Sequence, residues 1–98
     1  MSHAPSLALS RRHQAVRQRT AEQAVDALVV TSLPNVLYLT NFNGSAAIVV
    51  LTPARLFFIT DFRYAAALEA TRGTPHECPD LELVQVEHSY DETLARLL

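Results

Sequence analysis

The sequence predicts an α/β fold in which a mixed sheet with a central antiparallel hairpin is flanked by helices. Two short apolar runs, residues 46–51 and 56–59, are rich in β-branched and aromatic residues, which is typical of strands covered on both faces. The turn between them contains Pro53, which cannot donate to a sheet ladder and presets the angle of a turn. Segments with helical spacing of apolar residues lie on both sides of this hairpin and predict the flanking helices.

The residues before the hairpin predict a helix, a strand and a second, short helix. Ser10 is the expected N-cap of the first helix, which runs to about Val25. One face of this helix is apolar but thin, with members at Leu9, His13, Val16, Thr20 and Ala24. Residues 27–31 then predict a buried strand, and Pro34 starts a short helix. Residues 1–9 are expected to be a disordered N-terminus, and residues 10–98 to form the domain.

The residues after the hairpin predict two further helices with a strand between them. Thr60 or Asp61 is the expected cap of a helix that ends near Gly73, followed by a loop at residues 76–80. Residues 81–86 alternate in polarity as a strand does, and Ser89 or Asp91 opens a last helix. The apolar face of that helix, Leu94, Leu97 and Leu98, has only just formed where the sequence ends. We therefore expect the domain to be incomplete at its C-terminus.

The composition argues against several classes of function. The formal net charge of the 98 residues is -2, which gives no general attraction to nucleic acid or to an anionic membrane. Arg11, Arg12, Arg17 and Arg19 are expected to form a solvated helix face. No apolar run approaches the roughly 20 residues of a membrane-spanning helix, and the first ten residues lack a secretory pattern. The single cysteine, Cys78, fits a reducing compartment, so we expect a cytoplasmic protein.

No residues of the sequence predict a catalytic or metal site. A two-metal hydrolytic site needs carboxylates that converge from several strands, but the four aspartates here are expected at helix ends and in loops. The softer ligands His76, Cys78, Asp80 and His88 lack the second pair of a zinc site, so we expect a solvated loop with an incidental thiol. Ser45 lacks the second glycine of a nucleophile elbow and is expected in a turn.

Gly44 precedes this turn serine, and we expect it to hold a backbone angle that other residues avoid. No glycine-rich phosphate-binding motif is found in the sequence, so no nucleotide site is expected.

Three sequence blocks resemble the creatinase/prolidase N-terminal domain, in the order and at the spacing of that family. Residues 35–46, Asn-Val-Leu-Tyr-Leu-Thr-Asn-Phe-Asn-Gly-Ser-Ala, resemble its N-x-x-Y-L-T-G-F-x-G-S signature. Residues 60–64 resemble its T-D-x-R-Y block, and residues 26–32 its D-A-L-L-V-T-S strand. Asn41 stands where the family usually has glycine, and asparagine tolerates left-handed backbone angles better than most residues.

The resemblance, which in pattern is closest to Xaa-Pro aminopeptidases, implies both a fold and an activity. The fold would be ribonuclease-H-like, and the parent protein a metallopeptidase that acts on peptides with proline at the second position. Its divalent metal ions (manganese, cobalt or zinc) would be held by a C-terminal domain that is absent from these 98 residues, where a metal-bound hydroxide attacks the peptide. The present chain would have no cofactor and no catalytic residue, and would form a homo-oligomer, a dimer in that family's manner.

The resemblance also names the residues that would line a substrate entrance or a dimer interface. They are Asn35, Tyr38, Asn41, Phe42, Asn43, Arg63 and Tyr64. For Arg63 a second interpretation is open, in which Asp61 caps the following helix and Arg63 pairs with a carboxylate. Two other functions also remain open: a stand-alone, non-catalytic oligomerisation or interaction module, and the N-terminal domain of a prolidase or of a creatinase-type amidinohydrolase.

Overall fold

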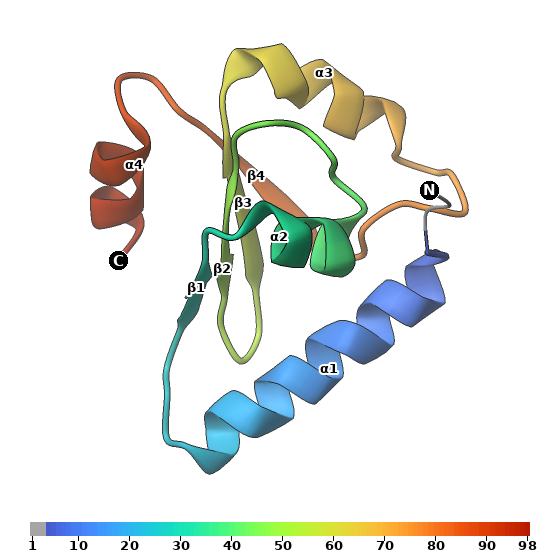
Figure 1. The fold of residues 1–98 in the computed structure, drawn as a ribbon, viewed down its shortest axis with the longest axis vertical. Helices are drawn as coiled ribbons and strands as arrows, with labels where there is room; N and C mark the ends of the chain where they lie inside the picture. The colour runs from blue at the N-terminus through green and yellow to red at the C-terminus, as the bar shows by residue number, and fades with distance from the viewer. Residues whose placement is uncertain (1–3) are drawn as a thin grey trace.

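The computed structural model describes residues 4–98, which form a four-stranded mixed sheet with helices on both faces (Figure 1). The strands lie in the order β1, β2, β3, β4, and the β3–β4 pair is parallel while the other two pairs are antiparallel. Their bounds are Leu28–Val30 for β1, Ile48–Leu51 for β2, Leu56–Thr60 for β3 and Leu81–Gln85 for β4. The predicted α/β class with an antiparallel hairpin at the centre of the sheet is confirmed.

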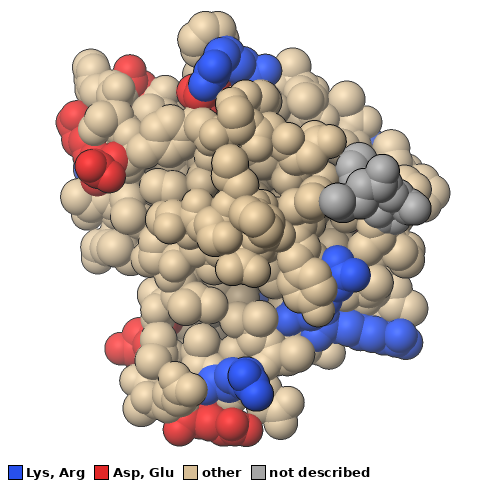
Figure 2. Space-filling view, in the orientation of Figure 1, with Lys and Arg blue, Asp and Glu red and all other residues tan. Residues whose placement is uncertain are grey.

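The helices divide unequally between the two faces of the sheet. Their bounds are Ser6–Glu22 for α1, Leu33–Thr40 for α2, Phe62–Ala70 for α3 and Tyr90–Leu97 for α4. The first three helices pack on one face, and α4 packs on the other (Figure 1). Charged side chains gather around the rim of the view in Figure 2, and a wide area without them lies over β1 and α2.

The central hairpin is buried because its residues are apolar on both faces. All four residues of β2 are buried, and Val49 pairs with Phe58 of β3. The hairpin turn closes when the Thr52 amide donates to the Arg55 carbonyl at 2.9 Å. The strand β2 begins two residues later than the predicted 46–51 run. Before the strand begins, the Ala46 carbonyl accepts a hydrogen bond from the Thr60 hydroxyl at 2.9 Å.

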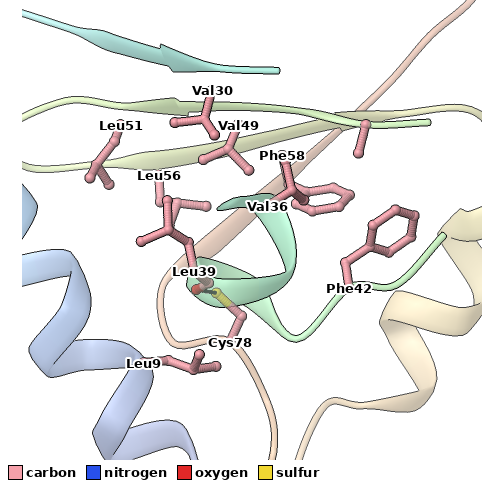
Figure 3. Packing of buried hydrophobic residues seen from close by; sticks show 11 residues of the cluster. Leu9, Val30, Val36, Leu39, Phe42, Val49, Leu51, Leu56, Phe58 and Cys78 are labelled. Atoms are coloured by element: carbon pink, nitrogen blue, oxygen red, sulfur yellow. Dashed lines mark hydrogen bonds between the residues drawn. The ribbon is translucent and has the colours of Figure 1, made fainter. Parts of the chain in front are cut away.

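The larger part of the core lies between the sheet and α1 to α3. Figure 3 shows Phe58 and Val49 on the strands pointing toward Val36 and Leu39 of α2, with Leu9 of α1 beneath them. On the opposite face a smaller cluster of Ile48, Val50 and Ile59 packs against α4. Burial of these side chains supplies the main stabilisation of the fold, since a fully buried Leu, Val or Phe contributes roughly 1.5–3 kcal/mol.

Two of the predicted helix caps are present. The Asp61 side chain accepts from the Arg63 amide at 3.0 Å and begins α3, and the Ser89 hydroxyl accepts from the Glu92 amide at 3.1 Å and begins α4. Each of these bonds satisfies one of the free N–H groups in the first turn of a helix. Such a cap typically adds ~1 kcal/mol to the free energy of unfolding.

The first helix differs from its prediction at both ends. It begins at Ser6 and not after Ser10, and it ends at Glu22 and not near Val25. Leu9 was placed in the disordered segment but is fully buried. The earlier start follows from a tertiary contact, since the Ser6 amide donates to the Pro75 carbonyl at 2.9 Å. Residues 1–3 of the segment expected to be disordered lie outside the described residues.

Hydrogen bonds to main-chain carbonyl groups hold α1 against the rest of the domain. Arg12 donates to the Tyr38 carbonyl at 2.7 Å, and Arg17 donates to the Thr52 carbonyl at 2.8 Å. The expectation of a uniformly solvated arginine face was therefore wrong for these two residues. A helix with a thin apolar face gains most of its stability from tertiary contacts, and here part of that contribution is polar.

His13, in the middle of α1, is a buried polar residue that makes a hydrogen bond to another helix. Its Nε2 donates to the Leu39 carbonyl at 2.7 Å, and its side chain is only 3% exposed. The same carbonyl lies 3.7 Å from the sulfur of Cys78, which is also buried. Burial lowers the pKa of His13 below its ordinary 6.5, against the opposing effect of the Leu39 bond, and burial raises the pKa of the Cys78 thiol to about 12.

Gly44 is present for a steric reason and not for the backbone angle that we expected. Its φ is not positive, unlike that of Gly73. A Cβ atom at Gly44 would lie 2.2 Å from Cζ of Phe42, far inside van der Waals contact. The Phe42 ring cannot easily move away, because it packs edge-on against Phe58 at 5.0 Å and against Tyr64 at 5.1 Å between ring centroids.

We predict that Gly44→Ala destabilises the domain by about 1–3 kcal/mol, the usual cost of overpacking a fixed core. In a Phe42→Leu background the same substitution should cost less, because the smaller side chain leaves room for the methyl group. Urea denaturation of the four proteins in this cycle measures the difference. Equal costs in the two backgrounds would contradict the steric explanation.

We also predict that the free energy of unfolding decreases as the pH falls below about 6.5, the ordinary pKa of histidine. The lowered pKa of His13 means that protonation favours the unfolded chain, so this stability is complete above pH 6.5 and is lost on acidification. His13→Gln, which retains a donor for the Leu39 carbonyl, should reduce the loss in thermal melts between pH 7 and pH 5. Exposed His88→Gln is the matched control, and an unchanged pH profile in His13→Gln would contradict the assignment.

Candidate functional site

The predicted site residues lie in and around two grooves. The first, here called the edge groove, runs between β1 and α2, with a volume of about 430 Å³. It is lined by Val16, Leu28, Val29, Val30, Thr31, Ser32, Asn35, Tyr38 and Leu39. The second, here called the loop groove, lies between α3 and the loops on either side of the sheet end, also with about 430 Å³. Residues 40–44, Tyr64, residues 67–68, residues 71–72, residues 76–78 and Leu81 line it.

Asn35 and Tyr38 lie three residues apart on α2 and therefore face the edge groove together. Both are exposed, and Tyr38 is 54% exposed. The guanidinium of Arg12 lies 4.1 Å from the centre of the Tyr38 ring and also bonds its carbonyl. These two contacts hold the ring in one position at the surface.

Asn41, Phe42, Asn43 and Tyr64 lie together at the loop groove. Phe42 is a core residue whose ring forms the groove floor, and Asn43 is exposed at its rim. Cys78, which we expected in a solvated loop, is buried on the same floor, so that expectation was wrong. The sulfur is covered because it packs with Leu39 and His13 beneath α1.

Asn41 ends α2 and stabilises the loop that follows it. Its φ of 67° ends α2 in the left-handed region, which asparagine adopts more readily than most residues. Its side-chain oxygen accepts from the Ala4 amide at 3.0 Å, and its nitrogen donates to the Ala4 carbonyl at 2.7 Å and the His76 carbonyl at 3.1 Å. The side chain is thus committed to three bonds and joins three distant segments.

Tyr64 and Arg63 belong to a polar cluster at the start of α3. The Tyr64 hydroxyl accepts from the Ser45 amide at 3.2 Å and shares a 2.5 Å bond with the Ser45 hydroxyl, and these bonds lower its pKa. Arg63 makes a two-point ion pair with Asp61, at 2.9 and 2.8 Å. Arg63, with a second bond from Tyr90, holds the pKa of the Asp61 carboxyl well below its usual range. The pairing interpretation of Arg63 is confirmed, and an interface role remains a prediction.

The residues present do not fit a catalytic metal. Within residues 4–98 no three histidine, cysteine, aspartate or glutamate side chains come together in a group that could hold one. Asp61, whose pKa lies well below its usual range, already has an arginine and a tyrosine as partners. In the same part of the chain, none of the helices has both the length and the apolar character that crossing a bilayer requires.

Some residues of these sites were not predicted from the sequence. Tyr90 bonds Asp61 across 29 positions, and Ser45 bonds Tyr64 across 19. No local pattern marks such pairs, because they depend on how α3 and α4 pack on the sheet. His13 did carry a signal, since it interrupts an apolar helix face, and a buried histidine needs a hydrogen-bond partner.

The fold and its two grooves define an α/β domain built on a mixed sheet, with no metal-binding group in the described part. Residues 12–98 match the family described as the Creatinase/Prolidase N-terminal domain, and the chain belongs to this family. The solved structure of an Xaa-Pro aminopeptidase from Streptococcus pyogenes is 32% identical and superposes with a TM-score of 0.80 over 94% of this chain. An Xaa-Pro dipeptidase from Bacillus anthracis is 25% identical, with a TM-score of 0.78 over 91% of this chain.

One curated relative is the uncharacterized peptidase YqhT of Bacillus subtilis (strain 168), which is 41% identical over 49 residues. Those residues make up 50% of this chain and 14% of that protein. The chain spans 66% of the Streptococcus pyogenes structure and 23% of the Bacillus anthracis one. The similarity therefore identifies an N-terminal domain of the kind found in peptidases.

We predict that Asn41→Gly lowers the free energy of unfolding by about 1–3 kcal/mol, the cost of leaving partly buried hydrogen-bond partners unsatisfied. Glycine keeps the left-handed angle, so the loss reports the side-chain bonds together with the greater entropy that glycine gives to the unfolded chain. Asn41→Ala should cost roughly 1 kcal/mol more, since a Cβ is disfavoured at positive φ. Exposed Asn43→Ala is the matched control in urea denaturation, and an Asn41→Gly protein as stable as the parent would refute this role.

Proposed function

We propose that this chain is the non-catalytic N-terminal domain of an Xaa-Pro aminopeptidase-type metallopeptidase. In this proposal it contributes dimer contacts and shapes the entrance to an active site that another domain provides. The observation that carries the proposal is the family membership of residues 12–98, together with the TM-score of 0.80 to an Xaa-Pro aminopeptidase. The substrate class is a peptide with proline at its second position, as the name of that Xaa-Pro aminopeptidase indicates.

The chemistry of the described residues supports a non-catalytic role. Four carboxylates of the described residues are paired with arginines, among them Asp61 with Arg63 and Glu82 with Arg55. Ser45, the candidate nucleophile that the sequence raised, bonds the hydroxyl of Tyr64 and not a histidine base. Manganese, cobalt or zinc would accordingly be bound by the catalytic domain of a longer polypeptide and not by residues 4–98.

The exposed members of the predicted set are the ones suited to face a substrate or a second subunit. Asn35, Tyr38, Asn43 and Arg63 are exposed, and they lie at the edge groove, the loop groove and the start of α3. Asn41 would act indirectly, because its side chain fixes the loop from below. Aromatic side chains such as Tyr38 are enriched where protein surfaces bind partners, which favours this residue as the main contact.

A stand-alone interaction module is the second candidate function. The wide uncharged surface over β1 and α2 favours it, because surfaces without charges are more often buried by partners (Figure 2). A prolidase parent is a third possibility, favoured by the similarity to an Xaa-Pro dipeptidase. The candidates differ in the size of the native protein and in the peptides that it cleaves.

We predict that the native protein, recovered with an antibody to this domain, is several times larger than 10.8 kDa and hydrolyses Xaa-Pro peptides when supplied with manganese or cobalt. Its Tyr38→Ala variant should have a KM raised roughly three- to tenfold, because an entrance residue contributes binding that is uniform between substrate and transition state. Phe62→Ala, an exposed aromatic on α3, is the matched control.

The same measurements separate the alternatives. A native mass near 10.8 kDa would leave only the interaction module. Cleavage of Xaa-Pro dipeptides but not of longer peptides would indicate a prolidase. Sedimentation equilibrium of the native protein tests the dimer, and a monomer at high concentration would contradict the proposed dimer contacts.

A further inference from the structure

Strand β1 forms one edge of the sheet. It pairs with β2 on one side, through Leu28, Val29 and Val30, and the strand order places nothing on its other side. Among residues 4–98, no helix or loop forms a hydrogen bond with the outward N–H and C=O groups of this strand. Such an edge is a template for a further strand, and proteins usually cover it or protect it with charges.

The surroundings of β1 provide no such protection. No charged side chain lines the edge groove, and Val29 is exposed at the middle of the strand. The helix α2 forms the opposite wall, where Asn35 and Tyr38 stand beside the free edge. The uncharged area over β1 and α2 in Figure 2 is the same surface seen from outside.

We propose that the edge groove binds a short extended peptide segment with uncharged side chains, which adds to β1 as a fifth strand. The main chain of the peptide would bond the free edge of β1, and this contact gives affinity without regard to sequence. Alternate side chains would point into the groove, against Tyr38 and toward the amide of Asn35. The uncharged lining selects against basic side chains, because a positive charge placed there would lose its hydration without gaining a partner. An acidic side chain would meet only Arg12, whose guanidinium already stacks on the Tyr38 ring and bonds the Tyr38 carbonyl.

The size of the groove favours a peptide segment over a second copy of this chain. Its volume of about 430 Å³ lies in the lower part of the roughly 300–1,000 Å³ range of ligand sites. If β1 of a second copy paired with β1, each copy would also bring its own α2, which adjoins the strand directly through residues 31–32. That helix would have to lie beside the first α2, whereas a peptide segment brings no helix with it.

This inference deepens the proposed function, because it names the groove that would hold the extended part of a peptide substrate. Its test does not depend on hydrolysis, so the two can fail separately. The probe is the peptide acetyl-Thr-Val-Thr-Val-Thr-amide, titrated to millimolar concentration into the ¹⁵N-labelled 98-residue chain. We expect NMR shift changes in β1 and in α2, with the remainder of the spectrum unchanged.

Two N-methylated forms of the peptide make the test specific for strand pairing. One carries N-methyl groups on both valines and the other on the second and third threonines, so each blocks the amides along one edge of the extended peptide. Only the edge that faces β1 is needed, so one form should bind at least tenfold more weakly and the other about as well as the parent peptide. Tyr38→Ala and Asn35→Ala should each weaken binding roughly three- to tenfold, whereas Phe62→Ala should leave it unchanged.

Four outcomes would overturn the proposal. Equal binding of both N-methylated peptides would exclude strand pairing, and shift changes confined to the loop groove would place the peptide elsewhere. Shift changes in β1 that grow with protein concentration, without peptide, would assign the edge to a second copy of the chain. An unchanged spectrum at millimolar peptide would leave no site at all. Binding of the peptide by a protein that does not cleave Xaa-Pro bonds would retain this inference and reject the peptidase.

Discussion

The side chain of Asn41 makes the contact on which the arrangement of the surface elements depends. Its three hydrogen bonds join residue 4, the end of α2 and residue 76, which are otherwise far apart in the sequence. Because α2 stops at Asn41 with a left-handed turn, the following residues pass to Phe42 and the core, and the loop groove opens beside them. Both grooves border α2, so the position of that helix determines the shape of each.

The elements that depend on local patterns could be predicted from the sequence. The hairpin follows from two apolar runs around Pro53, and the caps at Asp61 and Ser89 follow from short-range hydrogen bonds. The start of α1 could not be predicted in this way, because it depends on a bond between Ser6 and Pro75, which lies in the loop between α3 and β4. Sequence patterns of neighbouring residues predict local structure, and they carry no information about where a distant loop lies.

In the candidate site, too, some features could be predicted from the sequence and others depend on contacts between distant residues. Six of the seven residues that the resemblance selected line one of the two grooves, and Arg63 lies outside both. The resemblance could not separate the residues that face solvent from those that hold the loop. Gly44 illustrates the reason. A glycine is usually explained by its backbone angle, yet here the deciding fact is the Phe42 ring fixed by Phe58 and Tyr64. Such a constraint becomes visible only when three side chains from different elements are placed together.

The two grooves differ in what they can contribute to binding. The loop groove is bordered by side chains that already have partners, such as Asn41, and by a ring that belongs to the core, so a ligand there would meet surfaces committed to stability. The edge groove offers main-chain groups that have no partner among residues 4–98 and an exposed tyrosine held in place by Arg12. Preorganised groups that need no rearrangement lose little entropy on binding. The edge of β1 is therefore the part of this domain where a peptide would form the most hydrogen bonds and displace the fewest contacts within the fold.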